Sequence, residues 1–269
     1  MIDIEFLKIY YPSEISENQS KMKHILKEYV ELLSLDYLSN SPYAEKLAFI
    51  GGTNLRLVKG INRFSEDLDF DCKDLDKNDF MLMTNGLIEF LNQNGFPAVA
   101  KEKESENLKA FRRSIMFPDL LYNLGITGHR EERFMLKIET QNQEFQYEKE
   151  RKLISRNGFN INILTPPDDV LCSMKLAATL SRSKGRDFYD TMFLLQQTKP
   201  NFNYLQNKCG IYNFTDLLNE FRTVISKTDL SLKEKDFDKL LFDERNSSSI
   251  HKIGEFLETN FQNFIENEK

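Results

Sequence analysis

The stretch that most constrains this 269-residue chain is residues 47–72, LAFIGGTNLRLVKGINRFSEDLDFDC. Its apolar run LAFI stops at Gly51-Gly52, which is typical of a buried strand that ends in a turn. Thr53 is placed to cap a short helix after the turn, and Gly60 is placed to end that helix. The stretch therefore predicts a strand, a turn, a short helix and a second strand.

The second predicted strand carries alternating acidic residues. Side chains alternate between the two faces of a strand, so Asp67, Asp69 and Asp71 are expected on one face. Two strand steps separate Cα atoms by roughly 6.5–7 Å, which lets Asp67 and Asp69 converge on divalent cations. A solvated strand edge explains the spacing equally well, whereas an EF-hand Ca²⁺ loop does not, because no glycine lies at its centre. Ser65 is expected on the same face, where its hydroxyl could bond a phosphate oxygen or be modified.

The Gly-Gly turn favours the metal-site interpretation. Backbone N–H groups at such a turn, before a helix, can cradle a phosphate, which predicts phosphate binding by Gly51, Gly52 and Thr53. Arg56 and Arg63 flank the motif and could neutralise phosphate or hold the carboxylates, although structural salt bridges explain both equally well. A phosphate cradle beside paired carboxylates is the equipment for metal-assisted phosphoryl or nucleotidyl transfer.

These motifs resemble those of a known family. GGTNLRL (51–57) followed by RFSEDLDFD (63–71) resembles the signature of the AbiEii/AbiGii-type toxin nucleotidyltransferases, within the DNA polymerase β-like nucleotidyltransferase superfamily. The segments LKIET (136–140) and KGRDFYD (184–190) also have counterparts there. The resemblance implies an α/β (α+β) nucleotidyltransferase fold, with a small mixed β-sheet flanked by helices and a helical C-terminal domain.

The resemblance also implies a third carboxylate on a later strand of the same sheet. That residue is Glu139, which would complete the metal set of Asp67 and Asp69 or activate the attacking hydroxyl. Spacing alone favours another role, in which Glu139 pairs with Lys137 on a solvated strand face.

A lysine and two aspartates follow in the helical part of the chain. Lys175 lies on a nearly apolar helix, where it needs a partner such as a triphosphate or a route by which it snorkels to the helix edge. The resemblance implies that Lys175 binds phosphate and that Asp187, or Asp190 as second choice, orients Lys175 or the base. Taken singly, Asp187 suits the helix dipole, and Arg186 with Asp190 is an ordinary i,i+4 pair.

Composition limits the remaining possibilities. A net charge of −6 argues against a broad electrostatic grip on nucleic acid but allows a local basic strip, for example around Lys109, Arg112 and Arg113. The three cysteines are far apart and form no C-x-x-C pair, which predicts a reducing cytoplasm. A signal peptide and a membrane-spanning stretch are not expected.

The Pro166-Pro167 pair predicts a domain boundary between a nucleotidyltransferase domain at 1–165, with an N-terminal helical segment, and a helical domain at 166–269. Hydrophobic periodicity predicts helices and strands outside the central motif. The helices are expected at 14–39, 78–94, 168–182, 186–197, 203–209, 214–227, 233–243 and 248–266, and the strands at 96–103, 108–117, 133–141, 152–155 and 160–164.

The leading hypothesis is a Mg²⁺- or Mn²⁺-dependent nucleotidyltransferase that moves an NMP from an NTP to a hydroxyl of RNA, such as tRNA, or of protein. The resemblance implies a toxin of a toxin–antitoxin or phage-defence system, with any antitoxin a separate chain. One alternative is a small-molecule, antibiotic-type nucleotidyltransferase, and another is a non-catalytic nucleotide- or RNA-binding module. Growth arrest on expression and metal-dependent turnover distinguish the three.

Overall fold

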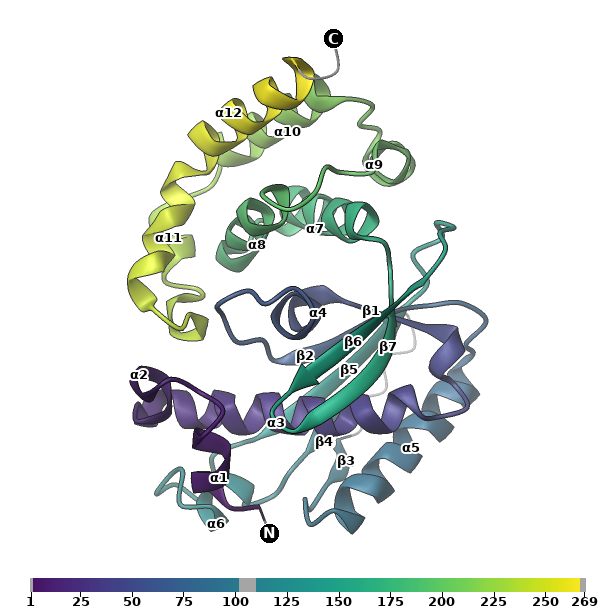
Figure 1. The fold of residues 1–269 in the computed structure, drawn as a ribbon, viewed down its shortest axis with the longest axis vertical. Helices are drawn as coiled ribbons and strands as arrows, with labels where there is room; N and C mark the ends of the chain where they lie inside the picture. The colour runs from purple at the N-terminus through teal and green to yellow at the C-terminus, as the bar shows by residue number, and fades with distance from the viewer. Residues whose placement is uncertain (1, 102–109, 267–269) are drawn as a thin grey trace. The chain divides into compact units, whose positions relative to one another are not determined.

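Five strands form the main sheet of the computed structural model, which describes residues 2–101 and 110–266 (Figure 1). The strands lie in the order β1-β2-β5-β4-β3. Their bounds are β1 Leu47–Ile50, β2 Asp67–Cys72, β3 Val99–Lys101, β4 Ala110–Met116 and β5 Met135–Gln141. Because β1 is antiparallel to β2 and β2 is parallel to β5, the sheet is mixed, as predicted.

Long helices cover this sheet. The helix α3 (Gln19–Ser39) contacts α5 (Lys77–Gln93) and β5, and α5 also contacts β3 and β4 (Figure 1). Beneath them, Leu68 on β2 and Ile138 on β5 are completely buried. Burial of these apolar side chains is the main force that holds the sheet to the helices.

A hairpin and several short helices complete this part of the chain. The hairpin of β6 (Glu150–Arg156) and β7 (Phe159–Thr165) forms a separate two-stranded sheet, and β7 contacts α3 and β1. The short helices are α1 Ile4–Lys8, α2 Ser13–Ser16, η1 Ala44–Lys46, α4 Gly51–Leu57 and α6 Leu120–Asn123.

The described chain divides into two compact units. Unit 1 comprises residues 1–60, 64–144 and 149–165, and unit 2 comprises residues 61–63, 145–148 and 166–269. Unit 2 is helical. Its elements are α7 Asp168–Arg182, α8 Gly185–Leu195, α9 Phe202–Cys209, α10 Phe214–Ser226, α11 Leu230–Glu234, η2 Asp238–Leu240, η3 Glu244–Lys252 and α12 Ile253–Glu266.

A tight connection joins α7 to α8. Ser183 closes α7 in the left-handed conformation, with φ of 49°. Gly185 then starts α8 against α11, where an added Cβ would lie 2.8 Å from the carbonyl carbon of Lys233. This connection turns the chain back so that α7 and α8 pack against each other.

Three predicted helices differ from the structure. The helix expected at 14–39 is interrupted, because Asn18 caps α3 by accepting a hydrogen bond from the backbone N–H of Ser20. The helix expected at 233–243 is wrong, since α11 ends at Glu234 and the buried Phe237 leads into a 3-10 turn. The last helix, expected at 248–266, begins as an α-helix only at Ile253, because residues 248–252 belong to the 3-10 segment η3.

Helices α1 and α6 were not predicted, because five and four residues are too few to show a helical period. The strand expected at 96–103 begins only at Val99, and its predicted end lies outside the described residues, as does Lys109. Across the described ranges, none of the helices combines the length and the apolar character that crossing a membrane requires.

Candidate active site

The carboxylates of β2 lie on the opposite face from its apolar side chains. Leu68 and Phe70 are 0% and 2% exposed, whereas Asp67 and Asp69 are partly exposed. The predicted alternation therefore holds from Asp67 onward, where the strand begins. Ser65 precedes the strand and is buried, so strand alternation does not extend to it and its place beside Asp67 stays a prediction.

Two neighbouring strands bring further charged residues beside these carboxylates. On β5, Lys137 is in register with Asp67, and Glu139 is in register with Asp69. On β4, Arg112 is in register with Glu139. Residues directly opposite each other on paired strands share a face of the sheet. We call these five residues, Asp67, Asp69, Lys137, Glu139 and Arg112, the acidic face.

Ion pairs link the strands of the acidic face. Arg112 binds Glu139 through two nitrogens, with Nε–Oε1 at 2.7 Å and Nη2–Oε2 at 2.8 Å. The hydrogen bond to Glu139 is the main reason that the pKa of Arg112 is raised. Lys137 lies 3.4 Å from Asp67, so the alternative in which Lys137 pairs with Glu139 is wrong. A fork-shaped guanidinium suits a bidentate carboxylate contact better than an ammonium does.

The Gly-Gly turn lies directly against the acidic face. Gly51 starts α4 with φ of +79°, a conformation that favours glycine. An added Cβ at Gly51 would lie 2.8 Å from the Cβ of Asp69 and nearer still to its carboxylate oxygen. Only glycine therefore allows the backbone of the turn to approach Asp69 this closely.

The two polar residues of α4 that were predicted to bind phosphate have structural contacts. Thr53 does not cap the helix; it is completely buried, and its hydroxyl donates a hydrogen bond of 2.5 Å to the backbone carbonyl of Asp67. Arg56 is 4% exposed and forms an ion pair of 2.6 Å with Glu28, which also accepts a hydrogen bond from Tyr11. The structure therefore favours the salt-bridge interpretation of Arg56, and it gives Thr53 the task of tying α4 to β2.

Asp71 lies farther along β2 and differs from the other two aspartates. It is 7% exposed, and its carboxylate accepts the backbone N–H of Gln143 at 2.8 Å. This contact fastens the segment that follows β5. Asp71 therefore has a structural contact, and its role as a peripheral metal ligand stays a prediction.

The donor chemistry of the acidic face fits a divalent cation. Within residues 2–101 and 110–266, no three His, Cys, Asp or Glu side chains are arranged to hold a metal ion by themselves. Mg²⁺, however, is commonly held by one or two carboxylates, with waters and substrate phosphates as its other ligands. Asp67 and Asp69 supply two such oxygen donors. Because Gly51 has no side chain, the backbone of the turn can lie directly beside Asp69.

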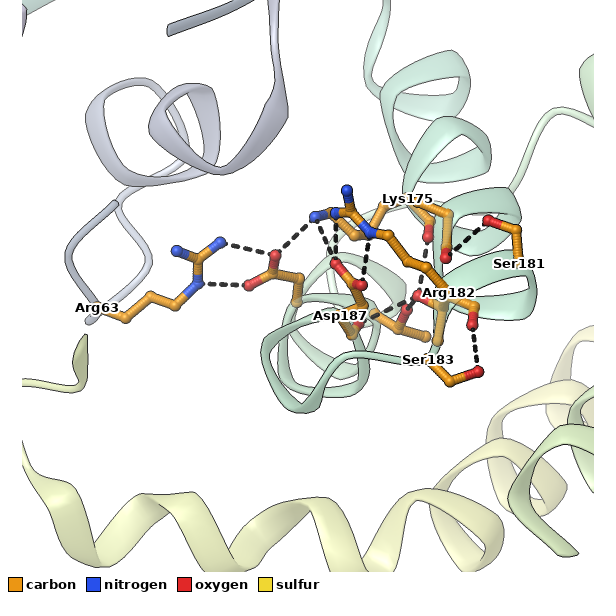
Figure 2. A network of polar contacts seen from close by, with 10 residues as sticks. Arg63, Lys175, Ser181, Arg182, Ser183 and Asp187 are labelled. Atoms are coloured by element: carbon orange, nitrogen blue, oxygen red, sulfur yellow. Dashed lines mark hydrogen bonds and ion pairs between the residues drawn. The ribbon is translucent and has the colours of Figure 1, made fainter. Parts of the chain in front are cut away.

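A second charged cluster lies in unit 2 (Figure 2). Lys175 contacts Asp190 at 2.8 Å and Asp187 at 3.3 Å. Arg63 binds Asp190 with two hydrogen bonds of 2.6 and 2.7 Å, and Arg182 binds Asp187 with two of 2.8 Å (Figure 2). We call these five residues the buried charge network.

Burial gives this network its character. Arg63, Asp187 and Asp190 are completely buried and Lys175 is 7% exposed, whereas the side chain of Arg182 is 46% exposed. Burial raises the pKa of Asp187, but the hydrogen bond from Arg182 and the charges of Lys175 and Arg182 outweigh it, so the pKa lies well below its usual range. Burial also raises the pKa of Asp190, and the charges of Arg63 and Lys175 bring it below its usual range. Both aspartates are therefore held as anions.

The network replaces simpler interpretations of single residues. Asp190 binds Arg63 and Lys175, so the ordinary helix pair of Arg186 and Asp190 is wrong. The ammonium of Lys175 does not snorkel to the helix edge, because it contacts both candidate aspartates. Whether Lys175 binds phosphate and Asp187 orients it stays a prediction from the resemblance.

No sequence motif pointed to Arg182. It lies seven residues after Lys175, which is two helical turns, so both residues fall on one face of α7. The same spacing rule places Asp187 and Asp190, three residues apart, on one face of α8. Two cations on one face of a helix, followed by two aspartates on one face of the next helix, were the sequence signal that could have predicted the network.

Comparisons with known proteins agree with this fold. The family model described as nucleotidyl transferase AbiEii toxin, type IV TA system, matches residues 33–267. The MenT4 nucleotidyltransferase toxin from Mycobacterium tuberculosis has a similar structure, with a TM-score of 0.62 and 16% identity over 96% of this chain and 90% of that one. The JHP933 structure from Helicobacter pylori matches with a TM-score of 0.54 and 20% identity over 91% of this chain and 94% of that one. A search of curated proteins finds no match.

Proposed function

Because the chain belongs to the AbiEii family of nucleotidyl transferase toxins of type IV toxin–antitoxin systems, we propose that it moves an NMP from an NTP to a hydroxyl of an RNA such as tRNA, with Mg²⁺ or Mn²⁺ as cofactor. Family membership makes the protein a nucleotidyltransferase and implies a nucleotide substrate and a separate antitoxin chain. The nucleotide, the metal and the RNA acceptor are the parts that the proposal adds.

The observation that carries the proposal is the contact between the Gly-Gly turn and the acidic face. The backbone at Gly51 lies against the Asp69 carboxylate, and no larger residue fits there. A phosphate held by the turn would therefore lie beside a cation held by Asp67 and Asp69. Phosphoryl-group transfer needs little beyond this positioning and charge neutralisation.

The three carboxylates of the acidic face then have a role. A divalent cation, when bound, neutralises the triphosphate and stabilises the departing pyrophosphate. Asp67 and Asp69 would hold it, and the backbone of Gly51 and Gly52 would hold a phosphate. Glu139 would add a third carboxylate or take the proton of the attacking hydroxyl at one of its carboxylate oxygens.

Unit 2 would supply two further residues. Lys175 is a compact cation of the kind that binds phosphate, and Asp187 contacts its amine at 3.3 Å. In the proposal, Lys175 neutralises charge on the triphosphate, and Asp187 fixes the direction of its side chain. These roles rest on the resemblance of the KGRDFYD segment to the family pattern.

The experiment that tests the proposal measures label transfer. Purified protein is incubated with Mg²⁺, total bacterial tRNA and each α-³²P-labelled NTP in turn, beside the Asp67→Ala/Asp69→Ala double variant. Label on RNA with wild type only would support the proposal and identify the nucleotide. Label on the protein itself would mean that the acceptor is a protein hydroxyl and not RNA. If none of the four NTPs gives label transfer although the protein binds NTP, the proposal is contradicted.

A further inference from the structure

Two cations of the acidic face are placed to bind more than their present partners. We propose that Arg112 and Lys137 are exchangeable counter-ions, which hold Glu139 and Asp67 until a divalent cation binds there and which then bind the triphosphate of the NTP. This inference rests on the proposed function, because it names the residues that would receive the substrate at the same site.

Register places both cations on the face that carries the carboxylates. Lys137 is paired in register with Asp67, and Arg112 with Glu139. The next arginine on β4, Arg113, lies on the other face, where its guanidinium contacts Met81 of α5. The two described arginines of the basic strip expected from the sequence therefore lie on opposite faces, and of the two, Arg112 faces the carboxylates.

Exposure allows the exchange. The side chains of Arg112 and Lys137 are 54% and 43% exposed, whereas those of their partners Glu139 and Asp67 are 26% and 24% exposed. The cations can therefore turn toward a ligand while the carboxylates stay in the sheet. Ion pairs this exposed contribute little to stability, so breaking them costs little.

Charge gives the exchange a direction. Three carboxylates and two cations leave the acidic face with one net negative charge, which attracts a divalent cation more than a triphosphate. Binding of that cation reverses the sign of the face and releases Arg112 and Lys137 from their partners. The same residues then present two positive side chains to the phosphate oxygens, and Arg112 offers the fork that binds such oxygens best.

The proposal makes two predictions of opposite sign for one substitution. In Arg112→Gln, the affinity for Mn²⁺ without nucleotide should rise about two- to fivefold, which is the strength of a half-exposed ion pair. The KM for the NTP should increase about tenfold or more, because a charge-assisted hydrogen bond to phosphate is lost. Lys137→Gln should change both quantities in the same directions, and Arg112→Lys should recover part of the NTP affinity.

The experiment combines calorimetric titration of the full-length protein with Mn²⁺ alone, titration with a non-hydrolysable NTP at saturating Mg²⁺, and steady-state kinetics. The matched control is Arg130→Gln, since Arg130 also holds a carboxylate, Asp119, through two nitrogens but lies in a turn outside the strands that carry the acidic face. Its metal and NTP affinities should equal those of wild type. Thermal unfolding verifies that each variant is folded. If Arg112→Gln does not fold, Lys137→Gln provides the same test.

Three results would overturn the proposal. The first is that the folded variants bind Mn²⁺ no more tightly than wild type does. The second is an unchanged affinity for the NTP, and the third is a change in the KM for RNA without a change in the KM for the NTP. Absence of label transfer by wild type with every NTP would refute the proposed function instead. The Mn²⁺ titration needs no turnover, so the two failures are distinguishable.

Discussion

The acidic face of unit 1 and the buried charge network of unit 2 contain the same kinds of groups, aspartate or glutamate held by lysine and arginine. On the acidic face, the paired side chains are 24–54% exposed. In the network, Arg63, Asp187 and Asp190 are 0% exposed, whereas Arg182 is 46% exposed. Exposed pairs contribute about 0–1 kcal/mol, while breaking a buried pair costs about 3–5 kcal/mol. Burial thus distinguishes ion pairs that are cheap to break from ion pairs that are costly to break.

The largest effect is expected from Asp190→Asn. This substitution removes the carboxylate that holds both Arg63 and Lys175, so two nearly buried cations lose a partner. The free energy of unfolding should fall by about 3–5 kcal/mol. Urea unfolding measures it, with Asp243→Asn as control, because the Asp243 pair with Arg245 is exposed and its loss should leave the midpoint unchanged. A loss below about 1 kcal/mol would mean that the network is not fixed by burial.

The next effect is expected at Gly51. Gly51→Ala places a Cβ against Asp69 in addition to straining a positive φ, so it should cost about 1–3 kcal/mol and also reduce nucleotidyl transfer. Gly60→Ala is the matched control, since Gly60 has φ of +81° but open space where its Cβ would lie. Urea unfolding and the transfer assay should show a stability loss for both variants and an activity loss for Gly51→Ala alone. Equal activity in both variants would contradict the close approach.

The buried network should also appear in the dependence of stability on pH. The folded-state pKa of Asp187 lies below the unfolded value of about 3.9. Its contribution is therefore fully present above about pH 4 and is lost as the pH falls toward the folded pKa. Unfolding free energies measured from pH 6 to pH 3 should decline more steeply for wild type than for Asp187→Asn. Parallel curves would contradict this assignment.

The smallest effect on stability is expected from Arg112→Gln. Its pair with Glu139 is half-exposed, so the free energy of unfolding should change by no more than about 1 kcal/mol. Arg63→Gln is the same substitution in the buried network and should destabilise the protein far more. Equal losses in urea unfolding would remove the distinction between the two regions.

Local patterns predicted much of the acidic face. The alternation of Asp67 and Asp69 with apolar residues and the turn at Gly51-Gly52 follow from short-range rules of strand and turn geometry. The resemblance added Glu139, and the structure brings it beside Asp69. The pairing of Glu139 with Arg112 depends on the register of two strands, which the sequence of either strand alone does not contain.

The buried charge network was less predictable. Arg63 and Asp190 are 127 positions apart, so no spacing rule links them. Arg56 likewise finds Glu28 only through tertiary packing, and its burial replaces the phosphate contact that its position beside the motif suggested. Propensity also failed at residues 233–243, where burial of Phe237 ends a helix that periodicity would continue.

Nucleotidyl transfer by Asp69→Asn tests most directly whether the acidic face carries the chemistry. The substitution keeps the shape of the side chain but removes the charge that would hold a divalent cation. Transfer of α-³²P label to tRNA should fall at least about a hundredfold, since metal-assisted charge stabilisation is worth several kcal/mol. The thermal midpoint should stay at or above that of wild type, and Glu150→Gln, an exposed strand carboxylate of the same unit, should remain active. Transfer within a few-fold of wild type by folded Asp69→Asn would contradict the assignment of the site.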